Sequence, residues 1–133
     1  MAEGAPVLSP PRPDLKWHRE ALSLAFPELV KKLVAMIGKR FTAYIGSVTD
    51  ARAVDRWIAD GRAYNSVEPR LRLAYHVAAM LGEHDAKRVV QAWLAGLNPE
   101  LNDRVPLTLL REGDIEKVGP EILRAARAFI AGG

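Results

Sequence analysis

Histidine is the side chain best suited to proton transfer or metal binding near neutral pH, and the chain contains three of them. His18, His76 and His84 lie far apart in the sequence, and no two are spaced as metal ligands on one helix would be. There is no cysteine, which excludes disulfides, thiolate metal sites and cysteine nucleophiles. The G-x-S-x-G, phosphate-loop and H-E-x-x-H patterns of common enzymes are also missing. We therefore expect no enzyme activity, no metal and no cofactor.

Basic residues in the first half of the chain are suited to a different chemistry, contact with nucleic acid. Residues 1–66 carry ten Lys and Arg against seven Asp and Glu, whereas residues 67–133 carry nine of each, so the first half holds the whole net charge of +3. Arg52 and Arg56 are four residues apart and share one face of a predicted helix, where they can reach base edges or phosphates. Lys39 and Arg40 begin the preceding predicted helix and are placed to meet phosphates. These four residues are the predicted DNA contacts.

Acidic residues on the same predicted helix support a competing interpretation. Asp55 and Asp60 would repel a DNA backbone. Under this alternative, residues 39–61 form a solvent-exposed helical hairpin whose arginines pair with these aspartates. Both interpretations turn the same apolar side chains inward, namely Val54, Trp57 and Ile58.

The elements that position these residues are all predicted to be helical. Two short helices over 39–45 and 51–60, joined by a tight break at Gly46–Thr49, are what a helix-turn-helix needs. Asn98-Pro99 predicts a turn, because the residue before proline disfavours the helical region. Gly119-Pro120 predicts an interruption of the last helix. No run alternates as a strand should, and apolar residues recur at helical spacing over 15–26, 29–37, 41–45, 51–60, 71–81, 86–95, 107–112 and 122–130.

The chain divides into three predicted regions. Residues 1–13 hold four of the nine prolines and should form a flexible Pro-rich tail. Residues 14–66 form a helical, helix-turn-helix-like region, and residues 67–133 form a second helical region. The chain start lacks the basic and apolar segments of a signal peptide, and no apolar run approaches the length of a membrane span, so we expect a cytoplasmic protein.

Three sequence segments together resemble the Xre/MbcA/ParS family of antitoxins. The first is Phe41–Gly61, with its Val-x-x-Trp pattern, and the second is Arg70–Leu81. The third and most specific is the order of Trp93–Leu101, Pro106–Asp114 and Ala125–Ile130. The resemblance implies an all-α fold in which an Xre-like helix-turn-helix precedes a helical toxin-binding domain.

The resemblance also implies a partner. Members of this family neutralise RES-domain toxins, which destroy NAD, by covering the entrance of the toxin active site. Their helix-turn-helix can repress the operon, and they form homodimers. Carried over to this chain, the implied toxin contacts are Asn98, Pro99, Leu101, Pro106, Leu110, Arg111, Asp114, Arg124, Arg127 and Phe129.

The residues themselves leave alternatives open. Trp93, Leu101, Leu110 and Phe129 can equally be core residues, and Asn98 can be a turn residue. The interruption at Val118–Glu121 leaves the register of the last contacts undecided. The alternative functions are a DNA-binding transcriptional regulator without a toxin partner, or a helical adaptor that has kept the fold and lost both partners.

Overall fold

The computed structural model describes residues 15–63 and 66–132, and the regular elements within them are helices. An isolated bridge between Asn98 and Arg104 is the extended pairing found there. The predicted all-α class is therefore confirmed, while the predicted tail over residues 1–13 lies outside the described residues. In chain order the helices are α1 (Leu15–Ser23), α2 (Phe26–Ile37), α3 (Lys39–Ile45), α4 (Arg52–Asp60), α5 (Val67–Gly82), α6 (Lys87–Ala95), the 3-10 turn η1 (Pro99–Leu101), α7 (Pro106–Glu112) and α8 (Ile115–Gly132).

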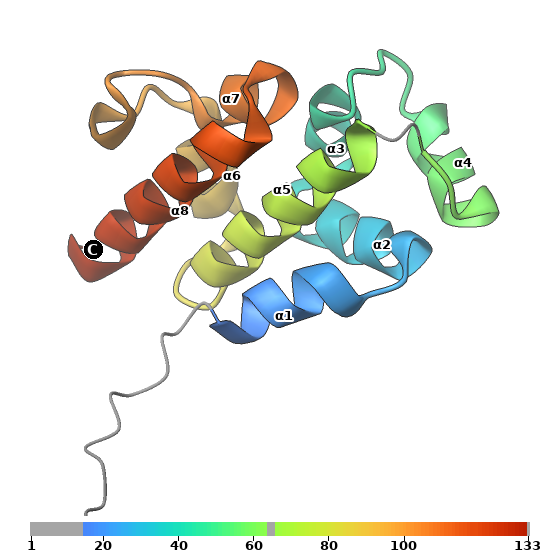
Figure 1. Cartoon of the computed structure of the whole chain (residues 1–133), viewed down its shortest axis with the longest axis horizontal. Helices are drawn as coiled ribbons and strands as arrows, with labels where there is room; N and C mark the ends of the chain where they lie inside the picture. The colour runs from blue at the N-terminus through green and yellow to red at the C-terminus, as the bar shows by residue number, and fades with distance from the viewer. Residues whose placement is uncertain (1–14, 64–65, 133) are drawn as a thin grey trace, which may run out of the picture.

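Helix α5 is the centre of the packing. It contacts α1 and α2 on one side and α8 on the other, and it runs through the middle of the molecule in Figure 1. Leu71, Val77 and Leu81 of α5 are completely buried, and each contributes roughly 2 kcal/mol relative to an exposed side chain. Buried residues from both halves of the sequence join one hydrophobic cluster around this helix.

The break between α1 and α2 lies earlier than predicted. Phe26 was predicted to lie in the first helix, but it begins α2 and is 5% exposed. Proline has no amide hydrogen to donate to the carbonyl four residues back, so it is tolerated in the first turn of a helix and not in its interior. Pro27 therefore forces α1 to end at Ser23 and becomes a first-turn residue of α2.

Both ends of α1 are held by hydrogen bonds, the first to Glu83 directly after α5 and the second to Arg72 within α5. The Trp17 indole Nε1 donates to Glu83 Oε1 at 2.7 Å, and Lys16 Nζ lies 2.9 Å from Glu83 Oε2. The hydrogen bonds from Lys16 and Trp17 lower the pKa of Glu83. At the other end, Arg72 Nη1 donates to the carbonyls of Ala21 at 2.8 Å and Leu24 at 2.9 Å. These carbonyls end α1, where helical acceptors have no partner within the helix.

Substitution of Arg72, the α5 residue that binds the carbonyls at the end of α1, tests this anchoring. We expect Arg72→Lys to lower the free energy of unfolding by about 2 kcal/mol, because an ammonium group cannot reproduce the planar fork that also holds Glu68 at 2.9 Å. Thermal unfolding followed by circular dichroism measures the change. Arg19→Lys on the exposed face of α1 is the matched control, and equal melting temperatures for the two variants would contradict the assignment.

The last helix is continuous, so the predicted interruption at Val118–Glu121 is wrong. Helix α8 runs from Ile115 to Gly132 with Pro120 inside it. Proline removes one backbone hydrogen bond here, and Gly119 before it has no Cβ to clash with the ring. Buried side chains on both sides of the proline, such as Val118 and Ile122, hold α8 against α5. The C-terminal residues therefore project from a single helix in one register.

Candidate functional site

The turn after α6 is built around Asn98. Its side-chain Oδ1 accepts from the amide of Glu100 at 2.9 Å, and its carbonyl accepts from the amides of Leu101 and Asp103. Asn102 and Asp103 both adopt positive φ, at 56° and 62°, which reverses the chain. The predicted turn is thus confirmed, and Asn98, only 7% exposed, is the residue that shapes it.

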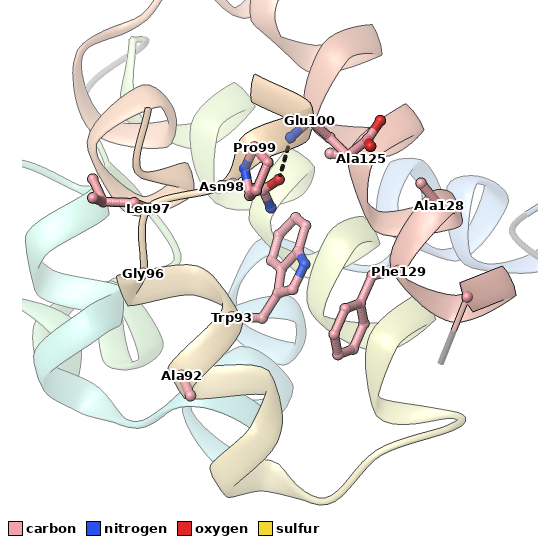
Figure 2. Close-up of a pocket in the computed structure, with 11 residues that line it drawn as sticks. Ala92, Trp93, Gly96, Leu97, Asn98, Pro99, Glu100, Ala125, Ala128 and Phe129 are labelled. Atoms are coloured by element: carbon pink, nitrogen blue, oxygen red, sulfur yellow. Dashed lines mark hydrogen bonds between the residues drawn. The ribbon is translucent and has the colours of Figure 1, made fainter. Parts of the chain in front are cut away.

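A groove opens between α6, this turn and α8, and we call it the C-terminal groove. Its volume is about 450 Å³. Figure 2 shows Trp93 of α6 and Phe129 of α8 beside one another on its walls, with ring centroids 6.4 Å apart and ring planes at 55°. Leu97 and Pro99 line it at the turn. Leu97 is 73% exposed and Phe129 37%, so the groove presents apolar and aromatic surface to solvent.

The predicted toxin contacts divide into buried and accessible residues. Leu101 and Leu110 are 1% and 0% exposed, and Asn98 and Pro106 are also buried. In this fold these four side chains form core and turn structure, and Asn98 also lines the C-terminal groove. The remaining six are at least partly accessible: Pro99, Arg111, Asp114, Arg124, Arg127 and Phe129.

The accessible residues do not form one site. Pro99 and Phe129 meet in the C-terminal groove, and Arg124 is exposed on the same helix as Phe129. Asp114 instead accepts the amide of Glu116 at 3.1 Å, at the start of α8. Arg111 faces α3, where its guanidinium lies 4.5 Å from the Tyr44 ring centroid. The turn at Asn98-Pro99 and the last helix are thus brought together, while Arg111 and Asp114 lie elsewhere.

Two residues of the groove were not predicted as contacts, namely Leu97 and Trp93. Leu97 stands between Gly96 and Asn98, outside the apolar stripe of α6, and an apolar residue in a turn is a signal of exposed apolar surface. Trp93 was interpreted as a core residue, and its half-buried side chain does pack on Phe129. Periodicity places it on the apolar face of α6, and only the position of α8 shows that this face is partly open.

The predicted DNA-contact residues lie on α3 and α4, which contact one another. Val54 and Trp57 are buried and Ile58 is half-buried, as predicted, so Arg52 and Arg56 point into solvent. Arg52 forms an ion pair with Asp50 at 2.7 Å. The side-chain and backbone hydrogen bonds from Arg52 lower the pKa of the Asp50 carboxyl.

Lys39 Nζ is likewise 2.7 Å from Asp55, whereas Arg40 is exposed. The competing interpretation paired the arginines with Asp55 and Asp60, and neither of those pairs is found among the described residues. Aspartates do neutralise two of the four predicted DNA contacts, although Arg52 takes Asp50 as its partner and not Asp55 or Asp60.

Residues 15–63 and 66–132 include no group of three His, Asp or Glu side chains arranged to hold a metal ion. None of the helices formed by these residues combines the length and apolar character that crossing a membrane requires. Burial, followed by a hydrogen bond with Glu20, raises the pKa of the Tyr75 phenol, which keeps that group protonated.

Comparison with known proteins identifies a similar structure. No protein-family model and no curated protein sequence matches this chain. One similar solved structure is a chain of the MbcT–MbcA toxin–antitoxin complex of M. tuberculosis, with a TM-score of 0.61 and 23% sequence identity. The match covers 79% of this chain and 96% of that chain. At this identity the similarity shows a common fold.

Proposed function

We propose that this chain is the antitoxin of a type II toxin–antitoxin system and that it binds and neutralises a RES-domain toxin. The shared fold with a chain of the MbcT–MbcA complex is the observation that carries the proposal. The match extends over nearly all of that chain, so it is not limited to a common helical motif. Of the two proteins in that complex, the antitoxin is the one whose family the sequence segments resemble.

The C-terminal groove is the proposed toxin-binding surface. Protein interfaces centre on aromatic and apolar anchors surrounded by polar residues. The groove supplies such anchors in Phe129, Leu97 and Trp93, and the exposed Arg124 provides a charged rim on the same helix. It lies within the segment that carries the most specific resemblance. By that resemblance, the bound antitoxin covers the entrance of the toxin active site and protects cellular NAD.

Co-expression tests the proposal directly. The chain is expressed together with the RES-domain toxin encoded beside it, and growth and cellular NAD are followed. We expect both to recover, and we expect a variant with Arg52→Glu and Arg56→Glu to rescue equally well, because these arginines lie on α4, outside the C-terminal groove. Failure of rescue while both proteins are expressed in soluble form would overturn the proposal.

DNA binding is the second candidate function. The protein would either repress its own operon in addition to neutralising a toxin, or act only as a DNA-binding regulator. The exposed residues Arg52 and Arg56 on α4 favour it. Residues four apart lie on the same face of a helix, so both arginines can contact one groove of DNA. A regulator without a toxin partner would bind DNA and show no rescue. The homodimer and the division near residue 66 stay predictions.

A further inference from the structure

A second, smaller pocket lies between α3, the turn over residues 46–51 and α7. Its volume is about 290 Å³. Arg40 of α3 and Arg111 of α7 both line it, together with Tyr44 and Thr49. The other lining residues are small and apolar, and there is no carboxylate among them. The pocket is therefore lined by two side chains with guanidinium groups and two with hydroxyl groups, which is a set of groups suited to an anion.

Arg111 is held in a fixed orientation in this pocket. Its guanidinium stacks 4.5 Å from the Tyr44 ring centroid, and its Nη1 donates to the Tyr44 carbonyl at 3.3 Å. A guanidinium has five N–H donors in a planar fork, so this one bond leaves most of them available. Stacking on an aromatic ring pre-orients such a fork for a bidentate contact with an oxyanion.

Arg40 and Arg111 differ from the neighbouring basic residues in their ion pairing. Lys39 is paired with Asp55 and Arg52 with Asp50, each at 2.7 Å. Within residues 15–63 and 66–132, no ion pair includes Arg40 or Arg111. Two like charges around one pocket repel each other, and an anion between them would relieve that repulsion.

We propose that this pocket binds a phosphate group of the DNA backbone and that Arg40 and Arg111 hold it together. The proposal rests on the DNA-binding part of the proposed function. Thr49 and Ala51 line the pocket, and Arg52 begins α4 immediately after them. A phosphate held here would fix the duplex at the start of α4, and phosphate contacts are what set the register of a DNA-binding helix. Arg111 would then serve DNA binding and not toxin binding.

The experiment measures affinity for duplex DNA as a function of salt. Fluorescence anisotropy is recorded with a labelled duplex from upstream of the chain's own coding sequence and with a shuffled duplex of equal length. We expect Arg40→Gln and Arg111→Gln each to weaken binding to both duplexes by about tenfold, because a charge-assisted contact is lost whatever the sequence. Since both side chains hold one phosphate, the double variant should bind little worse than either single variant. The double variant should also lower the magnitude of the slope of log association constant against log salt concentration by about 1.

The controls separate a specific pocket from a general loss of charge. Arg88→Gln removes an exposed charge from α6 and should leave DNA affinity within about twofold of the starting protein. Among the residues that the structure describes, the Arg40 side chain has no hydrogen bond or ion pair to lose, so its variant remains informative even if Arg111→Gln disturbs the contact between α7 and α3. Inorganic phosphate at constant ionic strength should compete weakly with DNA.

Four results would overturn the proposal. They are unchanged affinity and slope in both variants, equal loss in Arg88→Gln, strictly additive losses in the double variant, or binding of inorganic phosphate without any binding of DNA. A failure of the proposed antitoxin function is a different result. It would leave rescue absent in co-expression while the dependence of DNA binding on Arg40 and Arg111 persisted.

Discussion

Gly46→Ala is expected to lower the free energy of unfolding by about 3 kcal/mol, at the upper end of what overpacking a core produces. Gly46 is buried at the end of α3, and its φ of −80° is one that alanine adopts freely. The penalty is therefore steric. A methyl group at this position would overlap Cη2 of Trp57, and it would lie 3.1 Å from both Cζ2 and Cζ3. The Trp57 ring is itself 7% exposed and belongs to the hydrophobic core, so it cannot move aside without losing contacts.

Calorimetric or optical thermal unfolding measures this effect. In a chain of this length the loss corresponds to a melting temperature about 10 °C lower. Gly82→Ala is the matched control, because a Cβ at the end of α5 meets nothing within 4 Å. That control should be neutral or slightly stabilising, given the higher helix propensity of alanine. Equal melting temperatures for Gly46→Ala and the control would show that Gly46 and Trp57 do not approach this closely.

The same pair of residues shows what the sequence can and cannot predict. Gly46 is recognisable as a break between two short helices, and Trp57 as an inward residue of the second. The close contact between the glycine and the indole depends on how α3 and α4 pack, which no local pattern encodes. The positions of the helices were predictable because proline and glycine affect only the backbone within one helical turn of themselves. Their effect can therefore be inferred from the local sequence.

The errors have the same physical origin. Gly119-Pro120 is a strong local signal for a break, but the apolar face of α8 packs along α5 and one missing hydrogen bond does not outweigh that burial. Leu101 and Leu110 were left open between a partner surface and the core, and both are enclosed by the chain itself. Apolar periodicity predicts that a residue is buried, but it does not show whether the residue is buried within its own fold or against a partner.

The position of Arg111 was beyond prediction for a related reason. Its stacking on Tyr44 joins residues from opposite halves of the sequence, and neither residue has a local feature that indicates the other. By contrast, Pro99 and Phe129, two of the predicted toxin contacts, both line the C-terminal groove. Whether these two residues contact a toxin stays a prediction.

A double variant in the C-terminal groove, with Leu97→Ala and Phe129→Ala, should abolish neutralisation in co-expression. Truncation of an aromatic anchor in an interface costs about 2 kcal/mol or more, and a neighbouring apolar contact adds to it. The affinity for purified toxin should therefore fall by at least about a hundredfold. Leu97 is 73% exposed and Phe129 37%, so stability should change much less than binding. Isothermal titration calorimetry and the melting temperature of the free protein measure the two quantities separately.

Leu22→Ala is the control for the loss of exposed apolar surface outside the C-terminal groove. Leu22 is a large apolar side chain on α1, 63% exposed, and it lies outside the C-terminal groove. If apolar surface in general promoted association with the toxin, this variant would lose affinity as well. If the groove is the binding surface, Leu22→Ala should neutralise like the starting protein. Full toxin affinity in the groove variant would instead move the interface to another face of the molecule.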